Sequence, residues 1–216
     1  MGAFSGSMTF STFLVRGELP RDFRMRFLEG IRRDAFRPLV PEEETDESVG
    51  WCSIQHPFDL DLTLDKVLFN SYLNLGLRSD RWRIPASLFK AHFTERERDV
   101  LASKDRDRLT KREKAELKAA VTSTLRRQIL PAMKVVDLCW NLDTGVVRFW
   151  SQAKGLVETL HELFTETFGL SLVQHSPFVL ARSSGIDDDS IALLTTLEPT
   201  PFHALVLEDR ADDQEE

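Results

Sequence analysis

Side chains that could carry out catalysis are scattered thinly along this sequence. The histidines have no His or Cys partner at the spacing of metal ligands; they are His56, His92, His161, His175 and His203. Neither a glycine-rich phosphate loop nor the glycine spacing of a nucleophile elbow is present. We therefore expect no catalytic residue, no metal site and no cofactor.

Asp59 and Asp61 alternate on a predicted edge strand and form the one carboxylate pair whose spacing suggests chemistry. Two carboxylates can bind a metal ion for nuclease chemistry. That hypothesis predicts magnesium-dependent cleavage that the substitution Asp59→Ala abolishes. The surrounding sequence supplies no evident third ligand or lysine, and charges on an edge strand also prevent aggregation. We keep the nuclease as the third of three hypotheses.

Basic residues recur at helical spacing between Thr110 and Lys134, a segment that contains seven basic and two acidic residues. The whole chain carries a net charge of −7, but screening limits a distant charge to a reach of about 8 Å. An acidic protein can therefore present a basic face. Such a helix can also simply alternate charges on a solvated face.

Phosphate contacts are the chemistry that this basic segment suits. The residues predicted to contact DNA are Lys111, Arg112, Lys114, Lys118, Arg126 and Arg127. Contacts of this kind are independent of sequence, because phosphates carry no base identity. Most aromatic residues fall on predicted apolar stripes, so a stacking platform for single strands is not predicted.

The elements around the basic segment have clear local signals. Thr110 and Glu113 have the spacing of a capping box, and Pro131 ends the predicted helix at Leu130. Alternating apolar residues predict two strands joined by a hairpin at Asp143–Gly145. A second helix, with Ser151 as a plausible N-cap, then runs to Phe168 and ends at Gly169, followed by a strand over residues 170–173.

The other elements are predicted from periodicity and turn residues. Strands are expected at 10–15, 50–54, 66–77, 178–181 and 204–207, with Phe69, Leu73, Leu75 and Leu77 on one face of the third. Helices are expected from Pro20 to about Arg37, at 86–93 and at 189–197. Glu42–Glu47 is an acidic loop, Thr94 and Glu97 form a second capping box, and 96–108 is an exposed helix or arm.

These elements predict an α+β fold with antiparallel or mixed sheets and packed helices. We expect one domain over residues 1–207 and an acidic, disordered tail at 208–216. No apolar run approaches the roughly 20 residues of a membrane helix, and the first residues lack the pattern of a signal peptide. Cys52 and Cys139 are typical of reduced core residues, so we expect a cytoplasmic protein without a membrane partner.

The order of several motifs resembles the bacterial recombination-associated protein family RdgC, over residues 9–177. The motifs are Gly50-Trp51, Ile84-Pro85, the basic stretch Leu109–Lys118, Ile129-Leu130-Pro131, Asp143–Gly145 and Phe168-Gly169. The resemblance implies a non-enzymatic, nucleoid-associated protein that forms a ring-shaped homodimer around double-stranded DNA and restrains a RecA-type recombinase. Lys111, Arg112, Lys114 and Lys118 match the family's basic helix. The chain is shorter and more acidic than the family pattern, particularly in the C-terminal region that helps to close the ring.

Two further functions, from different classes, follow from the sequence and rank above the nuclease. The first is sequence-independent binding of duplex DNA that modulates recombination. The second is a protein–protein adaptor on the same scaffold, in which DNA binding is lost or is masked by acidic segments. The acidic loop Glu42–Glu47 and the acidic tail Glu208–Glu216 motivate the second function, because acidic segments can cover a basic face or mimic DNA.

Overall fold

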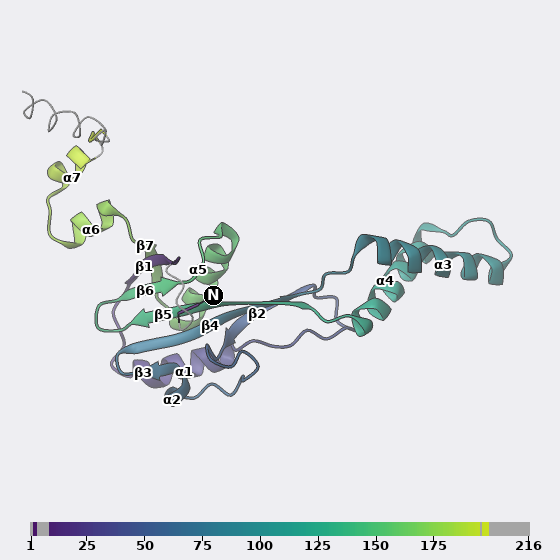
Figure 1. Cartoon of the computed structure of the whole chain (residues 1–216), viewed down its shortest axis with the longest axis horizontal. Coiled ribbons are helices and arrows are strands. Elements are labelled where there is room, and N and C mark those ends of the chain that lie inside the picture. Colours follow the sequence, from purple (N-terminus) through teal and green to yellow (C-terminus); the bar gives the residue numbers. More distant parts are fainter. Residues whose placement is uncertain (1, 4–8, 195, 199–216) are drawn as a thin grey trace, which may run out of the picture. The chain divides into compact units, whose positions relative to one another are not determined.

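The computed structural model describes residues 2–3, 9–194 and 196–198. Its elements follow in the order β1 (Ser11–Arg16), α1 (Phe23–Arg33), β2 (Glu47–Cys52), α2 (Leu64–Val67), β3 (Leu68–Phe69), β4 (Tyr72–Arg81), α3 (Ala86–Lys104), α4 (Lys111–Gln128), β5 (Ala132–Asn141), β6 (Val146–Phe149), α5 (Lys154–Phe168), β7 (Ser171–Gln174), α6 (Pro177–Ser183) and α7 (Asp188–Leu194) (Figure 1). The α+β class with an antiparallel sheet and packed helices is therefore confirmed.

The chain divides into two compact units, Met1–Val173 and Gln174–Glu216. The prediction of one domain to residue 207 stays a prediction. The expected strand at 204–207 and the expected tail at 208–216 lie outside the described residues. None of the described helices combines the length and the apolar composition that crossing a bilayer requires.

One seven-stranded sheet organises the first unit, with the order β2-β4-β5-β6-β1-β7 and β3 paired to β4. The central pair joins β4 to β5 over ten residues each, from Tyr72 opposite Asn141 to Arg81 opposite Ala132. The predicted turn at Asp143–Gly145 joins β5 to β6, and Gly145 takes a φ of 69°, the left-handed region that glycine tolerates best.

The core lies on one face of this sheet, under α1 and α5. Strand alternation sends Leu73, Leu75 and Leu77 of β4 to this face. Trp140 of β5 contacts Phe27 of α1 with ring centroids 5.3 Å apart and contacts Phe164 and Phe168 of α5 at 5.2 and 5.4 Å. Apolar burial of this kind is the main force that holds helices on a sheet.

Helix α5 confirms the predicted C-terminus and moves the N-terminus. Gly169 is the C-cap with a φ of 68°, as the Phe-Gly pattern predicted. The N-cap is Ala153 and not Ser151, whose hydroxyl instead accepts a hydrogen bond from the Ala153 backbone N–H at 3.2 Å.

The predicted strand over residues 66–77 is wrong in its first half. Leu64–Val67 is a short helix, and a tight turn at Asn70, with a φ of 52°, separates β3 from β4. Because the turn resets the strand alternation, Phe69 pairs with Tyr72 and shares its face, while Leu68 pairs with Leu73. Phe69 is consequently 72% exposed instead of lying in the core.

Three other predictions of local structure are also corrected. Thr94 does not cap a second helix, because α3 runs without a break from Ala86 to Lys104 and ends at Asp105 in the left-handed region. The predicted strand at 178–181 is helix α6, whose N-cap Ser176 accepts a hydrogen bond from the Val179 N–H. The predicted helix at 189–197 is α7, over Asp188–Leu194.

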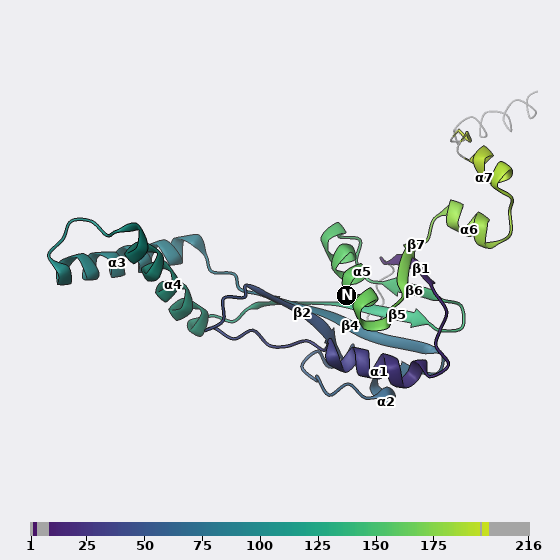
Figure 2. The ribbon, with the colours of Figure 1, turned by 180° about the vertical axis from the view of Figure 1, so that it is seen from behind.

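Helices α3 and α4 form a hairpin, Ala86–Gln128, between β4 and β5. Both views show the two helices side by side (Figures 1 and 2). No residue of α3 is buried, and α4 buries Val121, Leu125 and Arg126. The hairpin thus presents most of its charged side chains to solvent, as was predicted for the segment 96–108.

Candidate nucleic-acid interface

The N-terminus of α4 is fixed by the predicted capping box. The Thr110 hydroxyl accepts a hydrogen bond from the Glu113 N–H at 3.2 Å, and the Glu113 carboxylate accepts one from the Thr110 N–H at 2.9 Å. Lys104 donates a further hydrogen bond to Glu113 at 2.6 Å. The hydrogen bonds from Lys104 and Thr110 lower the pKa of Glu113 to about 2. The Glu113 carboxylate therefore caps the N-terminus of α4 and also links α4 to the end of α3 through Lys104.

Two of the six predicted DNA-contacting residues hold the acidic loop. The guanidinium of Arg126 donates hydrogen bonds to the Glu43 carbonyl oxygen and to the Asp46 carboxylate. Its side chain is only 8% exposed. Arg127 lies 2.9 Å from the Glu42 carboxylate, although its side chain is 62% exposed. The structure thus removes Arg126 from the surface that could contact phosphates and places Arg127 beside an acid.

The other four predicted residues differ in their partners. Arg112 pairs with Glu116 at 2.8 Å, and Lys114 lies 3.6 Å from Glu97. Lys111 and Lys118 make no ion pair with any described residue. Exposed ion pairs contribute only about 0–1 kcal/mol, so the acids beside Arg112 and Lys114 compete weakly with a phosphate.

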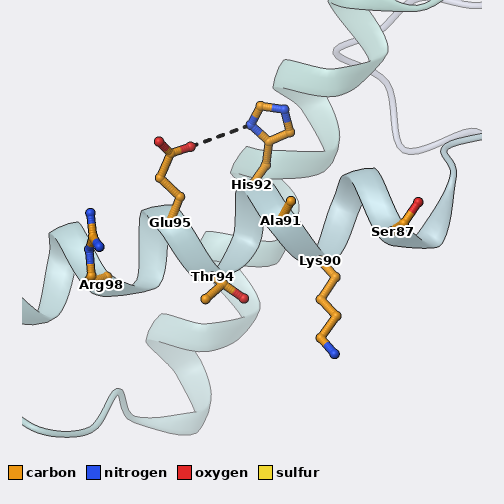
Figure 3. A pocket seen from close by; sticks show the side chains of 7 residues that line it. All are labelled: Ser87, Lys90, Ala91, His92, Thr94, Glu95 and Arg98. Atoms are coloured by element: carbon orange, nitrogen blue, oxygen red, sulfur yellow. Dashed lines mark ion pairs between the residues drawn. The ribbon is translucent and has the colours of Figure 1, made fainter.

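Helix α3 adds two cations that the sequence analysis missed. Lys90 and Arg98 line a shallow hollow of about 730 Å³ with Ser87, Ala91 and Thr94. Figure 3 shows that all the lining side chains, His92 and Glu95 included, come from this one helix. The hollow is therefore an open surface, on which small side chains separate two cations.

Helical periodicity explains this arrangement. Lys90, Thr94 and Arg98 recur every four residues, so they form one slowly turning row along the helix, with about 12 Å between the first and the last along the axis. Figure 3 shows the Lys90 and Arg98 side chains extending to opposite sides in that view. His92 and Glu95 pair with each other at 3.9 Å. Neither Lys90 nor Arg98 has an acidic partner in the part of the chain that the structure describes. Treating 86–104 as a single helix would have revealed this row in the sequence.

The hairpin as a whole is basic within an acidic chain. Residues 86–128 contain twelve basic and seven acidic residues, against a net charge of −7 for the protein. Six of the twelve have no ion pair among the described residues, and they are Lys90, Arg96, Arg98, Arg108, Lys111 and Lys118. An accumulation of exposed cations attracts polyanions at a rate that falls with ionic strength.

The carboxylates of the nuclease hypothesis lie elsewhere. Asp59 and Asp61 occupy the loop between β2 and α2 and not an edge strand. Lys66 lies 2.8 Å from Asp59 and 3.6 Å from Asp61, and its hydrogen bond lowers the pKa of Asp59. Within the described residues, no three His, Cys, Asp or Glu side chains form a group that could hold a metal ion. The cation between the two carboxylates is therefore the ammonium of Lys66.

No protein-family model matches the chain. A search of curated proteins finds no significant match either.

Proposed function

We propose that the protein binds double-stranded DNA without sequence preference, through the α3–α4 hairpin. The observation that carries the proposal is the set of exposed cations on both helices that have no acidic partner among the described residues. They stand out in a chain whose net charge is −7. Phosphates are the matching ligand, since affinity for duplex DNA is dominated by cation–phosphate contacts.

The contacting residues are revised from the sequence-based set. Lys111 and Lys118 of α4 are retained, and Lys90 and Arg98 of α3 are added. Arg112 and Lys114 remain available, because their ion pairs are solvent-exposed and weak. Arg126 is left out, since its guanidinium is buried against the acidic loop.

The resemblance to the RdgC family supports a biological setting for this binding. A homodimer on duplex DNA, located at the nucleoid and restraining a RecA-type recombinase, is the setting that the family suggests. In that setting the protein would modulate recombination without being an enzyme. Measuring the mass of the protein in solution, with and without duplex DNA, tests the dimer directly.

Salt dependence is the sharpest test of the DNA interface. The logarithm of the binding constant falls with the logarithm of salt concentration by about 0.9 per phosphate contact. We expect the fourfold variant Lys90→Gln, Arg98→Gln, Lys111→Gln and Lys118→Gln to reduce this slope by as much as about 3.6.

The matched control is Arg182→Gln, an exposed arginine of α6 paired with Asp188 at 2.9 Å. It should leave both affinity and slope unchanged. An unchanged slope in the fourfold variant, or no duplex binding by the native protein at low salt, would refute the proposal.

A protein–protein adaptor is the second candidate function. One observation favours it: four of the six residues first predicted to contact DNA pair with acids, two of them in the segment Glu42–Asp46. Deleting residues 208–216 separates the two functions. The deletion should raise DNA affinity if this acidic segment competes for the cations, and it should leave binding absent if the protein is an adaptor.

A further inference from the structure

A second hollow lies on the face of the sheet opposite the core, and the proposed DNA interface does not use it. Its volume is about 720 Å³, which falls within the range of small-molecule sites, roughly 300–1,000 Å³. Its floor is a row across three strands, because Asn74 of β4 pairs with Cys139 of β5, which pairs with Arg148 of β6. Strand alternation sends all three side chains to the face away from α1 and α5.

The walls come from segments far apart in the sequence. The loop after β2 contributes Ser53 to His56, and the β3–β4 turn contributes Phe69 and Tyr72. Lys66 of α2 is held in place by the Asp59 carboxylate at 2.8 Å and by the Asp61 carbonyl oxygen at 2.8 Å. Unlike the hollow on α3, this one is built by several elements that the fold brings together.

Two aromatic side chains at this hollow, Phe69 and Tyr72, are exposed to solvent. Phe69 is 72% exposed and Tyr72 is 39% exposed. They form a register pair beside the tight turn at Asn70, so their rings lie on the same face. Trp150 lines the hollow as well, with its ring centroid 5.4 Å from that of Phe10. Exposed aromatic rings in a concave site are typical of surfaces on which planar ligands stack.

Polar side chains at the same hollow could bind a phosphate and the polar edge of a planar ring. Arg148 makes no ion pair with any residue that the structure describes, and its guanidinium lies 5.8 Å from the centroid of the Phe10 ring. Guanidinium groups bind phosphate in a forked geometry. Asn74 and Gln55 supply amides, which can pair with the edge of a base. Burial raises the pKa of the Cys139 thiol to about 11, so this thiol is neutral at pH 7.

We infer that this hollow binds a nucleotide, with the base stacked on the aromatic rings of Phe69 and Tyr72 and the phosphate on Arg148. The bases of a duplex are paired and stacked, so they cannot enter a site of this kind without leaving the helix. The ligand is therefore a free mononucleotide or an unpaired base of a single strand. The inference departs from the expectation that no stacking platform is predicted, because the turn at Asn70 moves Phe69 out of the predicted core.

Calorimetric titration of the full chain with AMP tests the inference, and ribose 5-phosphate and adenosine serve as part-ligands. Loss of one stacked ring should weaken binding about tenfold, so Phe69→Leu should raise the dissociation constant of AMP by that factor. Arg148→Gln should weaken AMP about tenfold and leave adenosine unchanged. Phe178→Leu and Arg182→Gln in the second unit are the matched controls and should have no effect.

A short oligothymidine distinguishes the two sources of the nucleotide. If unpaired strands supply the base, Phe69→Leu lowers the affinity for the oligothymidine and leaves the affinity for duplex DNA unchanged. If the ligand is a free nucleotide, Phe69→Leu weakens AMP alone. The inference is overturned if neither AMP nor oligothymidine binds at about 1 mM ligand, if ribose 5-phosphate binds as well as AMP, or if the variants match their controls. Because Phe69→Leu leaves the cations of the α3–α4 hairpin unchanged, a loss of affinity in this variant reports on the hollow and not on the proposed DNA interface.

Discussion

Removing either partner of the ion pair between Arg126 and Asp46 should have unequal effects on stability. The two side chains differ greatly in exposure, at 8% for Arg126 and 74% for Asp46. The Arg126 guanidinium also bonds the Glu43 carbonyl oxygen at 2.5 Å, while its Nε has no partner among the described residues. We predict that Asp46→Ala lowers the free energy of unfolding more than Arg126→Met does.

The expected loss of stability in each variant depends on which charged side chain remains without its partner. Removing one partner of a fully buried pair costs about 3–5 kcal/mol, because the other charge is left without compensation. In Asp46→Ala the buried Arg126 keeps its bond to the Glu43 carbonyl, so we expect a loss of about 2 kcal/mol. In Arg126→Met the remaining Asp46 is already solvated and the buried volume is refilled, so the change should stay within about 1 kcal/mol.

Urea denaturation followed by far-ultraviolet circular dichroism measures both effects, and the double variant completes a thermodynamic cycle. The double variant should be about as stable as Arg126→Met alone, with a coupling energy of about 1–2 kcal/mol. Equal losses in the two single variants, or a larger loss for Arg126→Met, would contradict the burial argument. Duplex binding by Arg126→Met should keep the native salt slope, since this residue is not part of the proposed interface.

The remaining predictions concern two glycines and one carboxylate. Gly50→Ala should lower the free energy of unfolding by at least about 2 kcal/mol, because the new Cβ would lie 2.5 Å from the backbone of Phe36. Gly155→Ala in α5 should instead stabilise the protein by about 0.5 kcal/mol, because its Cβ would meet nothing within 4 Å. Urea denaturation of both variants measures the difference. Folding lowers the pKa of Glu113 from its ordinary value of 4.5 to about 2, so its ionised carboxylate stabilises the folded state. This stabilisation is fully present above pH 4.5 and is lost as the pH falls toward about 2. Glu113→Gln keeps the capping box but loses the charge that Lys104 faces, so melting temperatures should depend less on pH between these values than in the native protein.

The sequence by itself determined the elements whose signals are local. The capping box of Thr110 and Glu113, the left-handed Gly169 and the alternation of Val136, Leu138 and Trp140 all depend on neighbours within a few residues. Such signals specify helix ends and strand faces before any tertiary contact forms. The α+β class followed from these elements.

Only the tertiary structure decided what the charged and aromatic side chains meet. Arg126 had the spacing of a DNA contact, but its partner Asp46 lies 80 positions away in the sequence. Phe69 had the spacing of a core residue, but one tight turn at Asn70 reversed its face. A charge or a ring acts through its surroundings, and those come from segments that local periodicity cannot bring together. The basic helix could therefore be recognised in the sequence, while the cations left free on it, and the hollow beside Phe69, required the fold.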